Sequence, residues 1–194
     1  MSAAAPADPA NDTRCFLALL PDAAGVLALQ RCRASVERAI TGATRGVRWL
    51  DPASLHLTLR FLGASSSAQI EYLKHILPTL ASGLPALAGL RYGVWPNRAR
   101  PRMLVLELAA DASLSGLVHE CEMQARKAGF EPEPRGFRAH VTLARLRPGC
   151  GFGILPNPPS ALTFDTIALM RSTLVQPSAT YTELARASLA RAAP

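Results

Sequence analysis

A short motif that occurs twice constrains the fold of this chain more than any other feature of its sequence. Residues 56–63 read HLTLRFLG and residues 140–147 read HVTLARLR, so His-x-Thr-Leu stands once in each half. Successive side chains of a strand point to opposite faces, which places each histidine and its threonine on one face. The pattern therefore predicts two strands, each with a buried apolar face and a face that carries chemistry.

The elements predicted around the two motifs follow a repeated order. Apolar runs predict strands, and leucine-rich segments at helical spacing predict helices. Asp22 and Asp111 are the expected helix N-caps, and Gly129 is the expected end of the second long helix. In chain order we expect strand 14–20, helix 22–41, strands 47–50 and 55–62, a helix around 70–80, strands 87–95 and 102–108, helix 111–128 and strands 139–146, 162–174 and 180–189. This order indicates an internal duplication within an α+β fold.

The composition is that of one globular domain with an anionic partner. The chain has 194 residues, 49% of them hydrophobic, and a formal net charge of +7. This charge favours a nucleotide or RNA as partner, although the many arginines could equally reflect genomic base composition. We expect residues 1–12 to be a disordered tail rather than a secretion signal, and residues 13–190 to form a single two-lobed domain.

The remaining bulk features predict a cytoplasmic protein that lies outside the membrane. The four cysteines are scattered without a C-x-x-C pair, a usage typical of a reducing compartment. No apolar run approaches the roughly 20 residues that a membrane-spanning helix requires. We also expect the protein to act as a monomer.

His56 and His140 are the candidate catalytic residues. An unperturbed imidazole titrates near pH 6.5, so two facing histidines can hold opposite protonation states near neutral pH. One can remove a proton from an attacking water while the other protonates the departing oxygen, as an in-line displacement at phosphorus requires. Thr58 and Thr142 lie on the faces of their histidines, where each hydroxyl can donate to a phosphate oxygen. The proposed chemistry requires no metal and no cofactor.

Two arginines follow the motifs and are candidates for phosphate binding. Regular alternation places Arg60 on the face of His56 and Thr58. The same alternation turns Arg145 away from His140, so its participation depends on a bulge or on the end of the strand.

For several other residues we expect a structural role rather than a functional one. His75 and His119 fall in predicted helices, and Trp49 and Phe137 are expected to pack in the core rather than to stack on a base. Arg98, Arg100 and Arg102 could form a rim that faces RNA, but a solvated loop is the default. A zinc site is a weak alternative, because two histidines without a nearby carboxylate or cysteine do not complete a ligand set.

The segments RCFLALLP, VRWLDPASLHLTLRFLG, PRMLVLEL, RGFRAHVTLARL and IALMRSTLVQPSATYTELAR, taken in this order, resemble the 2H phosphoesterase superfamily. Within it they resemble the bacterial and archaeal RNA 2′,3′-cyclic phosphodiesterases, which are also called 2′-5′ RNA ligases. The resemblance implies a bilobal duplicated fold, with two mainly antiparallel sheets, outer helices, pseudo-twofold symmetry and a central cleft between the motif strands. One departure is Ala139, where relatives commonly have proline before the second histidine.

The resemblance also implies a reaction and roles for the motif residues. His56 would be the proton donor, His140 the proton acceptor, and Thr58 and Thr142 the phosphate-binding residues. The expected reaction opens the 2′,3′-cyclic phosphate of an RNA end or nucleotide to a 2′-phosphomonoester. Two alternatives stay open: joining of RNA through a 2′-5′ linkage, and a binding module for RNA ends that has no catalytic activity.

Overall fold

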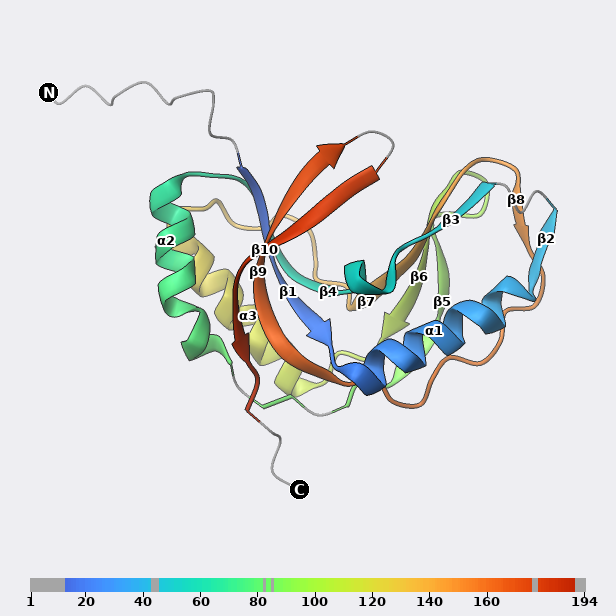
Figure 1. Ribbon diagram of the computed structural model, residues 1–194, viewed down its shortest axis with the longest axis horizontal. Coiled ribbons are helices and arrows are strands. Elements are labelled where there is room, and N and C mark those ends of the chain that lie inside the picture. The colour runs from blue at the N-terminus through green and yellow to red at the C-terminus, as the bar shows by residue number, and fades with distance from the viewer. Residues whose placement is uncertain (1–12, 43–45, 82, 85, 176–177, 191–194) are drawn as a thin grey trace, which may run out of the picture.

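The computed structural model describes residues 13–42, 46–81, 83–84, 86–175 and 178–190. The predicted N-terminal tail therefore lies outside the described residues. The strands are β1 (Thr13–Pro21), β2 (Ile40–Gly42), β3 (Val47–Trp49), β4 (Leu57–Ser65), β5 (Gly89–Pro96), β6 (Pro101–Leu108), β7 (His140–Leu146), β8 (Cys150–Phe152), β9 (Phe164–Val175) and β10 (Ser178–Ser188). The helices are α1 (Ala23–Glu37), α2 (Ser67–Ile76) and α3 (Ala112–Lys127), with short 3-10 turns at Pro52–Ser54 and Leu77–Leu80. An α+β fold is thereby confirmed (Figure 1).

Local sequence signals explain where the helices begin and end. The side chain of Asp22 accepts a hydrogen bond from the amide of Gly25, and that of Asp111 accepts one from the amide of Leu114, as predicted for N-caps. Ser66 and Gln69 form a capping box at the start of α2. Gly129 follows α3 with φ of +86°, a conformation that side chains with a Cβ rarely adopt.

Eight of the strands form one antiparallel sheet, whose two halves meet where β4 lies beside β7. We call this contact the joint. The order of the sheet is β10-β9-β1-β4-β7-β6-β5, and β3 also pairs with β7. β4 and β7 share a single residue pair, Leu57 with Val141. The structure thus differs from the expected two sheets, because this pair links the two halves into one eight-stranded sheet. A second, two-stranded sheet of β2 and β8 was not predicted, since three-residue strands carry no readable alternation.

Both motif strands contain a bulge at the same motif position. Leu17 and Ala18 of β1 pair with Arg60 and Thr58, so Leu59 is an extra residue of β4. The pairing of β6 with β7 skips Leu143 in the same way. An extra residue reverses the alternation of the side chains that follow it. The faces assigned by simple alternation therefore hold up to each motif threonine and change beyond it.

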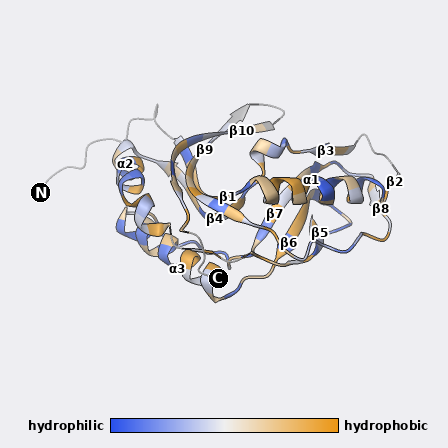
Figure 2. Cartoon of the chain, turned by 60° about the horizontal axis from the view of Figure 1, so that its bottom comes forward, coloured by the Kyte–Doolittle hydropathy of each residue, from blue (hydrophilic) through white to orange (hydrophobic). Residues whose placement is uncertain are grey.

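Each long helix covers the half of the sheet opposite to the one from which it starts. α1 leaves β1, yet Cys32 in α1 forms a side-chain hydrogen bond with Tyr92 of β5, and Arg33 lies over the ring of Trp49 in β3. α3 leaves β6 and packs beside α2, where Gln124 hydrogen-bonds to Tyr72. Figure 1 shows α2 and α3 together at one end of the molecule and α1 along the other. Hydrophilic and hydrophobic residues alternate along these helices (Figure 2), as expected for helices that bury one face.

The main core lies between the sheet and these helices. Leu17, Leu57, Leu104 and Val141 are fully buried there. A smaller cluster of Phe16, Ala18, Ala168 and Met170 lies apart from that core, with Tyr181 of β10 packed against it. No helix within the described ranges is long and apolar enough to cross a membrane.

Candidate active site

The joint between β4 and β7 brings the two motifs together. Leu57 and Val141 face each other across the antiparallel pair, and both side chains are fully buried. Their neighbours in the chain, His56 and His140, point to the opposite face and are partly exposed. In this register the two histidines are diagonal neighbours, for which Cα atoms lie about 7–8 Å apart.

Both imidazoles are oriented by the same kind of contact. Nδ1 of His56 lies 2.8 Å from the carbonyl oxygen of Ser54, and Nδ1 of His140 lies 2.7 Å from that of Arg138. A carbonyl can only accept, so Nδ1 carries the proton in each ring. The nitrogen that gains or loses a proton is therefore Nε2 in both histidines. The acceptor in each case is the carbonyl two residues before the histidine.

The surroundings of His56 strongly favour its neutral form. Its ring packs 4.9 Å from that of Phe16 and meets the ring of Tyr181 edge-on at 5.1 Å. The pKa of His56 is lowered to about 4, mainly by burial and also by the charges of His140 and Arg145, against the opposing effect of the Ser54 carbonyl. A partner anion would reverse this preference, because a nearby negative charge stabilises the imidazolium.

His140 lies in a more polar environment at the other side of the joint. Its ring centroid is 4.5 Å from that of Trp95, and the guanidinium carbon of Arg138 lies 3.7 Å over the Trp95 ring. Burial lowers the pKa of His140, while the Arg138 carbonyl and the charge of Glu107 raise it and the charges of Arg138 and Arg145 lower it. The result is a pKa below the ordinary value.

Glu107 organises the residues beside His140. Its carboxylate accepts hydrogen bonds from Nε1 of Trp95 at 2.9 Å, Nε of Arg91 at 3.0 Å and a terminal nitrogen of Arg138 at 3.3 Å. Burial opposes ionisation, but these donors outweigh it and hold the pKa of Glu107 below its usual value. Glu107 also pairs with His140 across β6 and β7. The charged carboxylate therefore fixes the Trp95 ring against the histidine.

The structure corrects the prediction for Arg60. The bulge at Leu59 turns Arg60 away from the face of His56, and its side chain is only 6% exposed. Its guanidinium forms ion pairs with Glu122 of α3 and Glu133. Phe61 points to the site face instead and is 48% exposed, 6.3 Å from the ring of Phe16. Arg60 thus serves to tie β4 to α3.

The matching bulge has the opposite consequence for Arg145. It returns this arginine to the face of His140. The charge of Arg145 contributes to lowering the pKa of His56 and that of His140. Thr58 and Thr142 are half-buried on the same face. Two imidazoles, two hydroxyls and one guanidinium are thereby collected around the joint.

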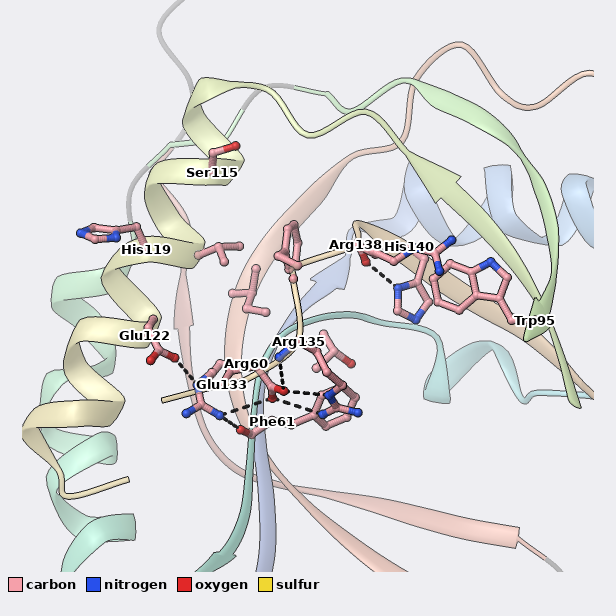
Figure 3. A pocket seen from close by; sticks show the side chains of 15 residues that line it. Arg60, Phe61, Trp95, Ser115, His119, Glu122, Glu133, Arg135, Arg138 and His140 are labelled. Atoms are coloured by element: carbon pink, nitrogen blue, oxygen red, sulfur yellow. Dashed lines mark hydrogen bonds and ion pairs between the residues drawn. The ribbon is translucent and has the colours of Figure 1, made fainter. Parts of the chain in front are cut away.

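A cleft of about 570 Å³ opens from this cluster towards α3. Thr58, Phe61, Trp95 and His140 line one part of it, and α3 forms the far wall (Figure 3). Phe137 lines the cleft while packing against the core, and His119, expected to be structural, belongs to the α3 wall. Among the described residues, no three His, Cys, Asp or Glu side chains gather as a metal ion would require.

Sequence reasoning missed the aromatic residues of the site. Phe16, Phe61, Trp95 and Tyr181 lie on four different strands and carry no local motif, so strand propensity accounts for each of them equally well. Glu107 was also missed. One signal was available for Trp95: it stands next to the arginine-rich turn between two predicted strands.

Part of the chain is similar in sequence to known phosphoesterases. Residues 21–105 match the family described as LigT like phosphoesterase. A Bacillus subtilis protein named RNA 2′,3′-cyclic phosphodiesterase is 35% identical over 50% of this chain and 55% of its own length. An Aquifex aeolicus protein of the same name is 30% identical over 61% of this chain and 62% of its own length. The matched regions thus span less than two thirds of these curated relatives.

Solved structures match over almost the whole chain. A Thermus thermophilus protein is 25% identical, with a TM-score of 0.68 over 91% of this chain and 97% of its own. A crystal structure titled phosphoesterase has a TM-score of 0.71 at 24% identity, covering 92% of this chain and 99% of its own. The Escherichia coli LigT structure with 3′-AMP has the same fold, with a TM-score of 0.64 at 24% identity over 92% of this chain and 98% of its own.

Proposed function

Because residues 21–105 match the family described as LigT like phosphoesterase, we propose that the protein hydrolyses the 2′,3′-cyclic phosphate of RNA ends or nucleotides to a 2′-phosphomonoester. The observation that supports this proposal is the Leu57–Val141 pair, which makes His56 and His140 diagonal neighbours, each with its Nδ1 against the carbonyl two residues earlier. Bacterial and archaeal relatives named for this activity support it. The catalytic unit is the single two-lobed domain of residues 13–190.

In the proposed reaction the two histidines act from opposite sides of the phosphorus atom. Nε2 of His140 takes a proton from water, whose oxygen forms a bond to phosphorus. The bond from phosphorus to the 3′ oxygen breaks, and Nε2 of His56 gives its proton to that oxygen. The phosphate stays on the 2′ oxygen. Each proton transfer of this kind contributes on the order of 10²- to 10⁴-fold.

The remaining groups bind the phosphate without exchanging protons. The hydroxyls of Thr58 and Thr142 donate to non-bridging oxygens, and the guanidinium of Arg145 stabilises the charge that grows on them in the transition state. Low local polarity strengthens these interactions relative to water. The proposed reaction uses no metal ion and no cofactor.

The assignment of His56 as acid depends on the bound substrate. In the free protein the pKa of His56 is about 4, so its imidazole is neutral near pH 7. A phosphodiester anion between the rings stabilises the imidazolium and raises this pKa. Substrate binding would therefore bring with it the proton that His56 later donates.

We also propose that the protein works in the cytoplasm. Cys15, Cys32 and Cys121 are buried thiols that form no disulfide. Thiols of this kind fit a reducing compartment.

A phosphorus NMR time course on cytidine 2′,3′-cyclic phosphate tests the proposed reaction. We expect the cyclic diester resonance to be replaced by that of the 2′-monophosphate alone. Persistence of the cyclic resonance at high enzyme concentration contradicts hydrolysis, and a 3′-monophosphate contradicts the assigned leaving oxygen. Adding an RNA with a free 5′-hydroxyl to the same reaction tests ligation, which would yield a new 2′-5′ diester.

A further inference from the structure

A second cavity adjoins the candidate active site on the side of the β5–β6 turn. It has a volume of about 580 Å³ and is lined by Trp95, Pro96, Asn97, Arg100, Arg102, Met103 and Arg138. Trp95 and Arg138 line the catalytic cleft as well, so this pair forms a wall that the two cavities share. We call this second cavity the arginine groove. The arginine groove therefore lies beside the part of the cleft that His140 and Trp95 line.

The lining of the arginine groove suits a chain of phosphodiesters. Of the residues that the structure describes, three arginines line it and no carboxylate does. Arg100 and Arg102 are exposed and form no ion pair within the described part of the chain, so their charges are available to a ligand. The backbone of the turn is held by a hydrogen bond from the amide of Arg100 to the side chain of Asn97. Guanidinium groups bind phosphates through paired hydrogen bonds.

Flat side chains stack on one another at the wall that the two cavities share. The His140 ring lies against Trp95, and the Arg138 guanidinium covers the same indole at 3.7 Å. The side chain of Arg138 is 58% exposed, and it is anchored by Glu107. Bases of single-stranded RNA stack on aromatic rings and on guanidinium planes. Arg138 thus presents a flat cationic surface at the mouth of the catalytic cleft.

We propose that the arginine groove binds the RNA strand on the 5′ side of the cyclic phosphate. The inference rests on the proposed function, because it assumes that the terminal phosphate lies between the histidines. It specifies the substrate class: an oligonucleotide that ends in a 2′,3′-cyclic phosphate, in preference to a free cyclic nucleotide. Phosphates upstream of the terminus contact Arg100 and Arg102, and an upstream base stacks on Arg138.

The test compares a cyclic mononucleotide with a five-nucleotide RNA that ends in a cyclic phosphate. In Arg100→Gln/Arg102→Gln we expect kcat/KM for the RNA to fall about tenfold, with the mononucleotide value within about twofold of wild type. Loss of two phosphate contacts should also reduce the slope of log kcat/KM against log salt by about 1.4. The control Arg14→Gln/Arg186→Gln removes the same charge from positions outside both cavities and should leave both substrates unaffected.

The possible results separate the groove from the reaction. Equal losses on both substrates, or no loss on the RNA, overturn the arginine groove while leaving hydrolysis intact. If wild type hydrolyses neither substrate, the proposed function fails. In that case fluorescence anisotropy with the same labelled RNA still tests whether the arginine groove binds RNA. The proposal requires Arg100→Gln/Arg102→Gln to bind this RNA more weakly than the control Arg14→Gln/Arg186→Gln does. Equal displacement of that RNA by a polyglutamate peptide would overturn the RNA assignment in favour of an acidic protein partner.

Discussion

Leu59 of β4 and Leu143 of β7 are the extra residues of two matching bulges, each one position after a motif threonine. The bulges reverse the side-chain alternation at equivalent points, so Phe61 and Arg145 take corresponding places on the site face. One half of the site thereby gains an aromatic ring and the other a guanidinium. The two halves therefore differ in chemistry although their motif strands are built alike.

Removing either imidazole should abolish most of the activity. We expect His56→Ala and His140→Ala each to lower kcat at least about 10²-fold, because each variant removes one proton-transfer step. Both rings are partly exposed, so the urea midpoint should change little. His75→Ala removes a histidine from α2 and serves as the control. Turnover equal to wild type in either motif variant would exclude the paired mechanism.

Arg145→Gln should lower activity and raise two pKa values. Loss of the charge removes transition-state stabilisation, which is worth about 10²- to 10³-fold in kcat for a single donor. Because Arg145 lowers the pKa of both His56 and His140, proton NMR titration of the variant should show both values rising. Arg147→Gln, at an exposed position two residues away, is the matched control. If the pKa values of His56 and His140 are unchanged in Arg145→Gln, the arginine does not act on these two histidines.

The pH dependence of kcat/KM, which reports on the free enzyme, should differ from that of kcat, which reports on the enzyme–substrate complex. The reaction needs one charged and one neutral imidazole, and both pKa values are lowered in the free protein. The profile of kcat/KM should therefore be bell-shaped, with an acidic limb near the His56 pKa of about 4 and an alkaline limb below about 6.5. The alkaline limb of kcat should lie at higher pH, because the bound anion raises the pKa of the acid. Coinciding limbs in the two profiles would contradict this electrostatic coupling.

Glu107 should act as a positioning residue for His140. In Glu107→Gln the charge that raises the His140 pKa is lost, so this pKa should fall and the alkaline limb of kcat/KM should move to lower pH. Gly93→Ala tests the same network sterically, since its Cβ would come within 2.7 Å of the Glu107 carboxylate and 2.9 Å of Trp95 Nε1. Glu71→Gln, on the exposed side of α2, should leave the profile unchanged. A profile unaffected in both network variants would leave Glu107 a purely structural role.

The joint should contribute strongly to stability. Leu57 is fully buried where β4 meets β7, so Leu57→Ala leaves a cavity and should lower the free energy of unfolding by about 2–5 kcal/mol. Leu90→Ala is the control: this side chain is 58% exposed and its loss should change the free energy by less than about 0.5 kcal/mol. Urea denaturation measures both. Equal midpoints would show that the single pair does not stabilise the contact between the halves.

The sequence was sufficient to predict the longer strands and the helices, because these depend on local signals. Caps such as Asp22 and Asp111 and the alternation up to Thr58 are readable within a few residues. A bulge depends on the neighbouring strand, so alternation alone assigned Arg60 to the wrong face and left Arg145 undecided. The contacts of Glu107 with three distant side chains likewise arise only when β5, β6 and β7 are assembled.

The crossed placement of the long helices makes the two halves inseparable as folding units. α3 is encoded after β6, yet its Glu122 neutralises Arg60 of the earlier strand β4, while α1 is encoded first and covers Tyr92 and Trp49 of later strands. A fragment that stops at the chain's midpoint would leave the Arg60 charge uncompensated and strip β4 of its apolar cover.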